Sequence, residues 1–226
     1  MSIENHFTKH AKDYDEHNIV QRIVSKALVR ELGLKPKRIL ELGCGSGQIF
    51  REFNWEMEEY VAVDFSSSMC ALHPKDNNVS VHCMDFDSDA FFELLENKQF
   101  DICISSSAMQ WSKNIDLLLQ RIMNVTNKFH GVLFTSNTFK SIFEITKEEK
   151  NILSLEEIKS AFSKYNASLE VFEYKINFDS QKELFSYIKN SGVQGESSLS
   201  YKQAKELYKK YPHLYLEFEV VFVKIG

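Results

Sequence analysis

The feature that most constrains this chain is the stretch RILELGCGSG at residues 38–47, in which a short apolar run leads into three alternate glycines. Residues 38–40 have the pattern of a buried strand. The glycines allow a tight turn and a close backbone approach that a Cβ atom would block. A helix is expected at about residues 48–53. A strand, a glycine turn and a helix in this order predict a loop whose backbone amides bind a nucleotide cofactor.

The spacing of the glycines favours one kind of cofactor over another. The dinucleotide fingerprint is G-x-G-x-x-G, whereas here the third glycine comes one residue early and Glu41 stands two residues before Gly43. A pyrophosphate has no use for a carboxylate at that point, but a cationic amino group does. The loop therefore favours S-adenosylmethionine over NAD. The alternative is a plain glycine turn between a strand and a helix.

Asp64 is the second cofactor candidate. It ends a predicted strand at residues 60–64 and lies 21 positions beyond Gly43 (64 minus 43). An acidic residue about 20 positions past the loop, at the carboxyl end of the adjacent strand, can accept hydrogen bonds from both ribose hydroxyls. The alternative is that Asp64 or Ser66 simply caps the following helix.

The segments ELGCGSG and VAVDFS resemble motifs one and two of the class I S-adenosylmethionine-dependent methyltransferases. The resemblance implies a Rossmann-like α/β fold with a seven-stranded, mostly parallel sheet, an antiparallel last strand and helices on both faces. It also places Glu41 and the glycine loop at the methionine end of the cofactor, Asp64 at the ribose, and Asp85 with Phe86 at the adenine. The expected cofactor-binding residues are Glu41, Gly43, Cys44, Gly45, Gly47, Asp64, Phe65, Asp85, Phe86 and Ser105.

No metal site is expected. Asp85, Asp87 and Asp89 have the spacing of a calcium loop, but the glycine and the terminal glutamate of such a loop are missing. The four cysteines form no C-x-x-C pair, and buried free thiols are the expected state.

A finer resemblance comes from SSSAMQW after a predicted fourth strand at residues 100–105, from a fifth strand at 131–136, and from the N-terminal Phe7, Ala11 and Tyr14. Together these segments resemble the malonyl-acyl-carrier-protein O-methyltransferases of biotin synthesis. The resemblance implies methyl transfer to the free carboxylate of a malonyl thioester, with malonyl-acyl-carrier protein or malonyl-CoA as partner. Tyr14, Gln110 and Trp111 are the expected catalytic residues on the substrate side.

The chain departs from that group in two places. The usual Lys-Pro-Gly before the fifth strand is replaced by KFHG at residues 128–131, although Gly131 remains to make the turn. The segment between Glu144 and Leu155 is short and lacks an arginine, which puts a contact to the substrate carboxylate in doubt. Three alternatives stay open: another small acid or a hydroxyl as acceptor, a non-catalytic binding protein of this fold, and a purely packing role for Phe7 and Tyr14.

Length and charge set the remaining expectations. The 226 residues fit one domain, with an N-terminal segment (1–33) across the cofactor cleft and a core (34–226) that carries a helical insertion near 181–211. In the first segment, Ile19, Ile23, Ala27, Leu28 and Leu32 follow the helical period, and Gly33 ends the helix.

A net charge of −5 and a pI near 5.8 argue against nucleic acid as a partner. The chain has no apolar run of 18 residues, so we expect a cytoplasmic protein without membrane attachment. We also expect a monomer. An acidic carrier protein would require a basic surface near the cleft. The candidate lysines are Lys182, Lys189, Lys202, Lys205, Lys209 and Lys210, which could equally form a solvated helix face.

Overall fold

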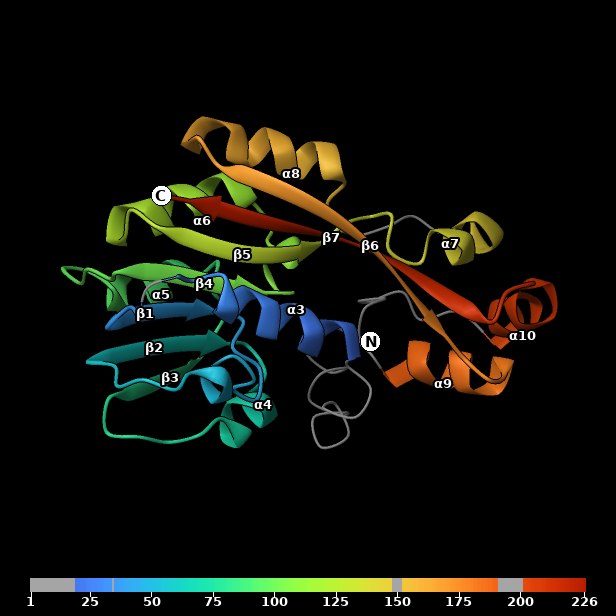
Figure 1. Cartoon of the computed structure of the whole chain (residues 1–226), viewed down its shortest axis with the longest axis horizontal. Helices are drawn as coiled ribbons and strands as arrows, with labels where there is room; N and C mark the ends of the chain where they lie inside the picture. Colours follow the sequence, from blue (N-terminus) through green and yellow to red (C-terminus); the bar gives the residue numbers. More distant parts are fainter. Residues whose placement is uncertain (1–18, 34, 148–151, 191–200) are drawn as a thin grey trace.

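The computed structural model describes residues 19–33, 35–147, 152–190 and 201–226. Its strands form one seven-stranded sheet with helices on both faces (Figure 1). The strands are β1 (Arg38–Leu42), β2 (Glu59–Asp64), β3 (Val79–Cys83), β4 (Ile102–Ser106), β5 (Phe129–Phe134), β6 (Ser168–Asn177) and β7 (Tyr215–Ile225). The α-helices are α3 (Ile19–Arg30), α4 (Ser67–Leu72), α5 (Asp89–Leu94), α6 (Ile115–Val125), α7 (Lys140–Thr146), α8 (Leu155–Phe162), α9 (Gln181–Asn190) and α10 (Tyr201–Lys210). Short 3-10 helices are η1 (Phe50–Glu52), η2 (Met109–Trp111) and η3 (Ser163–Tyr165).

The strand order is β3-β2-β1-β4-β5-β7-β6. Strands β1 to β5 all run parallel to one another, whereas β7 runs antiparallel to both β5 and β6. The order reverses at β1, which has β2 on one side and β4 on the other. Open α/β sheets bind their ligands at the carboxyl ends of the strands at such a switch point. The predicted fold class is confirmed.

Strand β1 shows how the sheet separates two apolar layers. Ile39 packs into the layer that contains α3, and Leu40 and Leu42 pack into the opposite layer with α6 and α8. Successive side chains of a strand point to opposite faces, so a strand buried on both faces is apolar almost throughout. The exception is Glu41, which is 1% exposed and belongs to the site described below.

Helix α3 buries part of the apolar set that follows the helical period in the sequence. Leu28 and Leu32 are buried, whereas Ile19 is 38% exposed and Ile23 49% exposed. Val20 and Val24 face the sheet in their place. The pairs Ile19–Ile23 and Val20–Val24 have the same i, i+4 spacing, and only the sheet decides which one faces it.

The predicted helix at residues 48–53 is also largely absent. Only η1 forms there, and Phe53 is already extended. Its ring lies 4.7 Å from that of Trp55, whose Nε1 donates a hydrogen bond to the Pro36 oxygen at 2.9 Å. This packing, together with the early start of β2 at Glu59, turns the chain back towards the sheet before a second helical turn can form.

Other predicted elements agree closely with the structure. Helices predicted at 115–125 and 181–190 have those bounds, and the predicted helix at 201–211 ends one residue earlier. The fifth strand starts at Phe129, two residues before its predicted start, and the sixth is one residue shorter at each end than predicted. Helices α7, α9 and α10 gather at one end of the sheet (Figure 1). No helix in the described ranges is both long and apolar enough to cross a membrane.

Candidate functional site at the carboxyl ends of the strands

The glycine loop after β1 is tied to β2 by its own backbone. The N–H groups of Gly43 and Cys44 both donate to the Val63 oxygen, at 2.8 and 3.0 Å. Gly43 has φ +70°, and a Cβ built on it would stand 2.1 Å from the Cβ of Ala108. Gly45 has φ +52°, and no atom of the described residues lies within 4 Å of the corresponding position. Thus Gly43 lets the turn after β4 approach, and Gly45 borders open space that a ligand can enter.

Asp64, at the end of β2, holds the loop from the other side. Its Oδ2 accepts from Gly45 N at 2.9 Å, and its Oδ1 accepts from Ser66 N at 2.9 Å. Burial raises the pKa of Asp64, and the two amide hydrogen bonds oppose that rise. A carboxylate offers about four acceptor sites, so two backbone bonds leave capacity for hydroxyl groups. The predicted ribose contact and the alternative role in starting α4 are therefore compatible.

Glu41 faces the α3 side of the sheet beneath the loop. Its Oε2 accepts a short hydrogen bond from the hydroxyl of Tyr60, and both side chains are buried. Burial raises the pKa of Glu41 to about 8, the Tyr60 bond opposes this, and the negative charge of Asp64 adds to it. At neutral pH this carboxyl group therefore keeps its proton in the free protein. Its predicted role at the methionine end of the cofactor remains a prediction.

Cys44 and Gly47, the other predicted residues of the glycine loop, pack against the protein interior. Cys44 is buried, and burial raises the pKa of its thiol well above the ordinary value, so the thiol is unreactive. Its predicted cofactor contact stays a prediction. Gly47 has φ +86°, and a Cβ there would lie 2.5 Å from Pro74 Cδ. Phe65 follows Asp64 directly and is half-buried.

The segment after β3 brings the predicted adenine contacts to the same edge of the sheet. Phe86 is buried, and its Cε1 lies 4.0 Å from the position of a Cβ on Gly43. The carboxylate of Asp85 is 43% exposed, accepts from Asp87 N at 2.9 Å and pairs with Lys113 Nζ at 2.6 Å. An exposed carboxylate beside a buried ring is suited to an adenine amino group.

The turn after β4 contains the predicted substrate residues. Gln110 is buried, and its Nε2 donates to Ser107 O at 2.8 Å. Trp111 is half-buried at the end of η2. The hydroxyl of Ser105 is buried and donates to Leu42 O at 2.9 Å, so it joins β4 to β1. Its predicted contact with the cofactor stays a prediction. Tyr14 lies outside the described residues.

Ser107 is a feature of this turn that sequence reasoning missed. Its φ is +60°, a left-handed conformation that side chains other than glycine adopt rarely. Ser107 Oγ and Gln110 Oε1 are buried and have no hydrogen-bond partner within the described part of the chain. Backbone strain and unsatisfied buried polar atoms gather at functional sites. The only sequence signal was the run of three serines at 105–107, which fits many structures.

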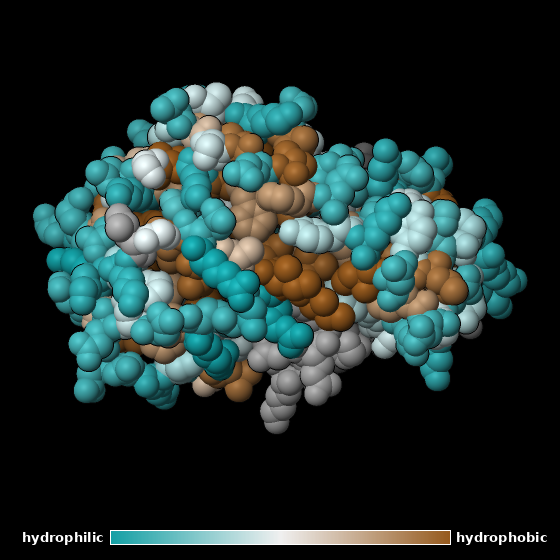
Figure 2. Space-filling model, in the orientation of Figure 1, coloured by the Kyte–Doolittle hydropathy of each residue, from teal (hydrophilic) through white to brown (hydrophobic). Residues whose placement is uncertain are grey.

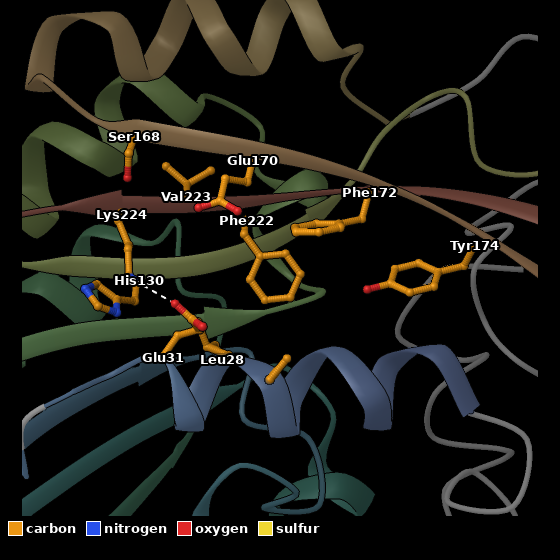
Figure 3. Close-up of a pocket in the computed structure, with 11 residues that line it drawn as sticks. Leu28, Glu31, His130, Ser168, Glu170, Phe172, Tyr174, Phe222, Val223 and Lys224 are labelled. Atoms are coloured by element: carbon orange, nitrogen blue, oxygen red, sulfur yellow. Dashed lines mark hydrogen bonds and ion pairs between the residues drawn. The ribbon is translucent and has the colours of Figure 1, made fainter.

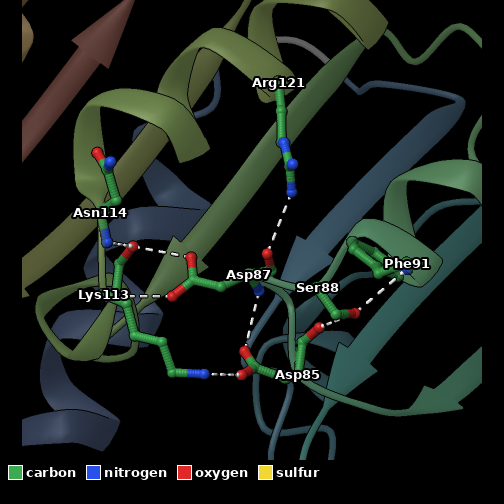
Figure 4. A network of polar contacts seen from close by, with 8 residues as sticks. Asp85, Asp87, Ser88, Phe91, Lys113, Asn114 and Arg121 are labelled. Atoms are coloured by element: carbon green, nitrogen blue, oxygen red, sulfur yellow. Dashed lines mark hydrogen bonds and ion pairs between the residues drawn. The ribbon is translucent and has the colours of Figure 1, made fainter.

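Asp87 joins the two halves of the site (Figure 4). Its Oδ1 accepts from Ser112 Oγ at 2.8 Å, and its Oδ2 accepts from Lys113 N at 2.7 Å. The Asp87 oxygen also accepts from Arg121 Nη1 at 3.1 Å. The carboxylate of Asp87 thus fixes the segment after β3, which carries the predicted adenine contacts, to the turn after β4, which carries the predicted substrate residues. Sequence reasoning considered Asp87 only as a calcium ligand.

A separate hollow of about 230 Å³ lies between α3 and strands β5, β7 and β6 (Figure 3). Its walls include Phe172, Tyr174 and Phe222, with Lys224 paired to Glu31 at 2.9 Å at one end. His130 in its wall has its pKa lowered to about 4, first by burial and then by the charges of nearby lysines. The hollow runs along β5 from His130, near the start of the strand, to the level of its carboxyl end, because Phe172 pairs with Val220, which pairs with Phe134 at the end of β5. It lies on the β5-β7-β6 side of the sheet, whereas the glycine loop and Asp64 follow β1 and β2.

The sheet order, the glycine loop and the acids at successive strand ends define a class I methyltransferase fold. Residues 39–128 match the model of the methyltransferase domain family. The chain is an S-adenosylmethionine-dependent methyltransferase.

Relatives and solved structures agree with this assignment. The chain is 26% identical to a malonyl-[acyl-carrier protein] O-methyltransferase of Bacillus cereus, over 94% of this chain and 88% of that protein. It is also 26% identical to the enzyme of that name from Acinetobacter baylyi, over 96% and 88%. A putative methyltransferase structure from Bacillus halodurans matches the fold with TM-score 0.65 at 12% identity, over 88% of this chain and 96% of that one. A plantazolicin methyltransferase bound to S-adenosylhomocysteine matches with TM-score 0.55 at 17% identity, over 97% and 93%.

Proposed function

We propose that this methyltransferase acts on the free carboxylate of a malonyl thioester carried by acyl-carrier protein and forms its methyl ester, as an early step of biotin synthesis. The observation that carries the proposal is the similarity to malonyl-[acyl-carrier protein] O-methyltransferases over 94% of the chain. The arrangement of the site supports it, because cofactor and substrate candidates flank one switch point.

The cofactor set fits S-adenosylmethionine. The open side of Gly45 leaves room at the loop, the carboxylate of Asp64 has free acceptor capacity for ribose hydroxyls, and Asp85 is exposed beside Phe86. When bound, the cofactor supplies an electrophilic methyl group on a sulfonium sulfur. The task of the chain is to hold that group in line with the acceptor oxygen.

The acceptor needs no general base. A carboxylic acid with a pKa near 4 is already ionised at neutral pH, so its oxygen can attack directly. Positioning alone can contribute up to about 7–11 kcal/mol to catalysis. We assign this positioning to the turn that carries Gln110 and Trp111, together with Tyr14 from outside the described residues. Asp87 keeps that turn at a fixed distance from the cofactor side.

The test is transfer of a labelled methyl group from S-adenosylmethionine to malonyl-carrier protein, with acetyl-carrier protein as the matched control without a free carboxylate. We expect a methyl ester on the malonyl thioester alone and release of one S-adenosylhomocysteine per ester. Equal methylation of malonate or of a hydroxyl acid would contradict the proposal. Growth of a biotin-requiring strain that lacks this activity, after the gene for this chain is introduced, tests the role in the cell.

Cofactor binding is tested separately, because it does not depend on which acceptor is methylated. Asp64→Ala should weaken S-adenosylhomocysteine binding by roughly 1–3 kcal/mol, through loss of hydrogen bonds to a charged group. Calorimetry of the wild type and the variant measures the difference. Equal affinity in the two proteins would remove Asp64 from the cofactor site.

A further inference from the structure

The outer face of α3 combines exposed isoleucines with a row of basic side chains. Ile19 and Ile23 are 38% and 49% exposed, although large aliphatic side chains are usually buried in a folded core. Arg22, Lys26 and Arg30 are also exposed and follow each other at intervals of four residues. Residues at that spacing lie on one side of a helix. We call these five residues the α3 face.

Among the described residues, one of the three cations of the α3 face has an ion-pair partner. Lys26 pairs with Glu52 at 3.4 Å, at a partly exposed site. Within the described ranges, no ion pair involves Arg22 or Arg30. The neighbouring Glu31 is bound to Lys224 at 2.9 Å. This local concentration of cations contrasts with the net charge of −5 of the whole chain.

The α3 face lies close to the substrate turn. The hydroxyl of Ser25, on the buried side of α3, lies 3.0 Å from the hydroxyl of Ser106, the last residue of β4. Ser107 and η2 follow directly. Since an α-helix with its side chains is about 10–12 Å across, the α3 face is about one helix thickness from the turn. Figure 2 shows hydrophilic side chains over the place of α3, next to a hydrophobic area.

We infer that the α3 face is the surface on which an acidic acyl-carrier protein docks; the inference rests on the proposed function. Apolar side chains surrounded by cations suit a partner with acidic side chains around an apolar centre. Complementary charge speeds the encounter and fixes its orientation, while the two isoleucines supply contact area that loses water. The contact between Ser25 and Ser106 joins the docking surface to the turn that positions the acceptor.

The lysines of α9 and α10 are the competing surface. There the cations alternate with acids: Glu183 follows Lys182, and Glu206 follows Lys205 and pairs with Lys210. Helix α10 also lies at the far end of the molecule in Figure 1, whereas α3 runs alongside β4 and β5. Acids also border the α3 face, Glu31 after Arg30 and Glu52 beside Lys26, but Glu31 is bound to Lys224.

The experiment compares two substrates that carry the same malonyl thioester, malonyl-carrier protein and malonyl-pantetheine. The double variant Arg22→Glu/Arg30→Glu should lower kcat/KM for malonyl-carrier protein at least tenfold and change kcat/KM for malonyl-pantetheine less than twofold. Arg22→Gln/Arg30→Gln should give a smaller loss with the same selectivity. The control Lys205→Glu/Lys209→Glu changes the net charge equally on α10 and should have little effect. Higher salt should reduce the wild-type rate on the carrier protein much more than the rate on malonyl-pantetheine.

A direct measurement of binding distinguishes failure of the docking surface from failure of the proposed function. Affinity for the carrier protein, measured by calorimetry without turnover, should fall at least tenfold in the α3 double variant, while S-adenosylhomocysteine affinity stays unchanged. Equal loss on both substrates, or a loss confined to the α10 variant, would overturn the docking surface. A wild type that methylates neither malonyl substrate would overturn the proposed function. If such a wild type also failed to bind the carrier protein, the docking surface would be refuted with it.

Discussion

Glu41 contributes to the pH dependence of the free energy of unfolding of the protein without cofactor. Its pKa is raised by burial from the ordinary 4.5 to about 8. Between these values the native chain keeps a proton that the unfolded chain releases. The contribution is fully present below about pH 4.5 and is lost as the pH rises through 8, with a slope of at most about 1.4 kcal/mol per pH unit for one proton.

Glu41→Gln should remove this part of the pH dependence, because an amide cannot ionise. Relative to wild type, the variant should therefore gain stability steadily from pH 5 to pH 8. Urea unfolding of both proteins without cofactor, at several pH values in that range, measures the difference. Two curves that stay parallel over the range would show that Glu41 does not titrate there.

Gly45 and Gly33 form a matched pair for testing the cofactor loop. Both have positive φ, +52° and +66°, and within the described part of the chain a Cβ on either would meet no atom within 4 Å. Alanine at each position should cost roughly 1–2 kcal/mol of stability from the left-handed backbone. Only Gly45→Ala should weaken S-adenosylhomocysteine binding, by tenfold or more in calorimetry, since only Gly45 borders the predicted site. Equal affinity in the two variants would remove Gly45 from the site.

At the scale of elements, Asp87 is the link between the segment after β3 and the turn that contains η2. Asp87→Ala removes its hydrogen bonds to Ser112 and Lys113, so the substrate turn should become looser. We expect kcat/KM to fall about tenfold, at a cost in stability of roughly 1–3 kcal/mol. Trp111 should also become more accessible to acrylamide quenching, measured in a Trp55→Phe background.

Asp89→Ala is the control for that experiment. Asp89 is exposed, and its carboxylate pairs with Arg121 on α6 without contacting the turn. It should leave both the turnover and the quenching of Trp111 close to wild type. If Asp87→Ala did the same, the link would have no part in positioning the substrate.

The strand ends were predictable from sequence because they depend on local patterns. Apolar runs that end in an acid or a glycine located Gly43, Asp64 and Asp85, and parallel strands bring such ends to one edge. The buried stripe of α3 was not predictable, since Ile19–Ile23 and Val20–Val24 have the same spacing. Only the sheet against which the helix packs distinguishes the two stripes.

The partners of the site residues depend on contacts that sequence does not contain. Asp87 bonds to residues 25 and 26 positions away, and the hydroxyl of Ser105 bonds to β1, 63 positions away. The left-handed conformation of Ser107 is held by the same tertiary packing, including a bond from its N–H to Val132 O at 2.8 Å. Residue types and their spacing yield candidates for the site, whereas these supporting contacts appear only in the folded chain.

At the scale of the whole molecule, the two sides of the sheet should respond differently to the cofactor. Saturation with S-adenosylhomocysteine at 100 times its Kd should stabilise the fold by about 2.7 kcal/mol. In hydrogen exchange, protection should increase at the glycine loop, the end of β2 and the turn after β4. It should not change around the hollow lined by Phe172 and Phe222, on the β7-β6 side of the sheet. Protection confined to that hollow would move the binding site to that side.

The three-residue η1 also bears on which ligands the loop can accept. A long helix carries roughly half a positive charge at its start, a field that attracts phosphates. A helix of one turn, as here, has almost none of this field, and the carboxylates of Asp64 and Asp85 stand nearby. A doubly negative dinucleotide would meet carboxylates without a compensating dipole, whereas a sulfonium cation meets no positive helix end. The abbreviated helix thus discriminates between cofactors by the sign of their charge.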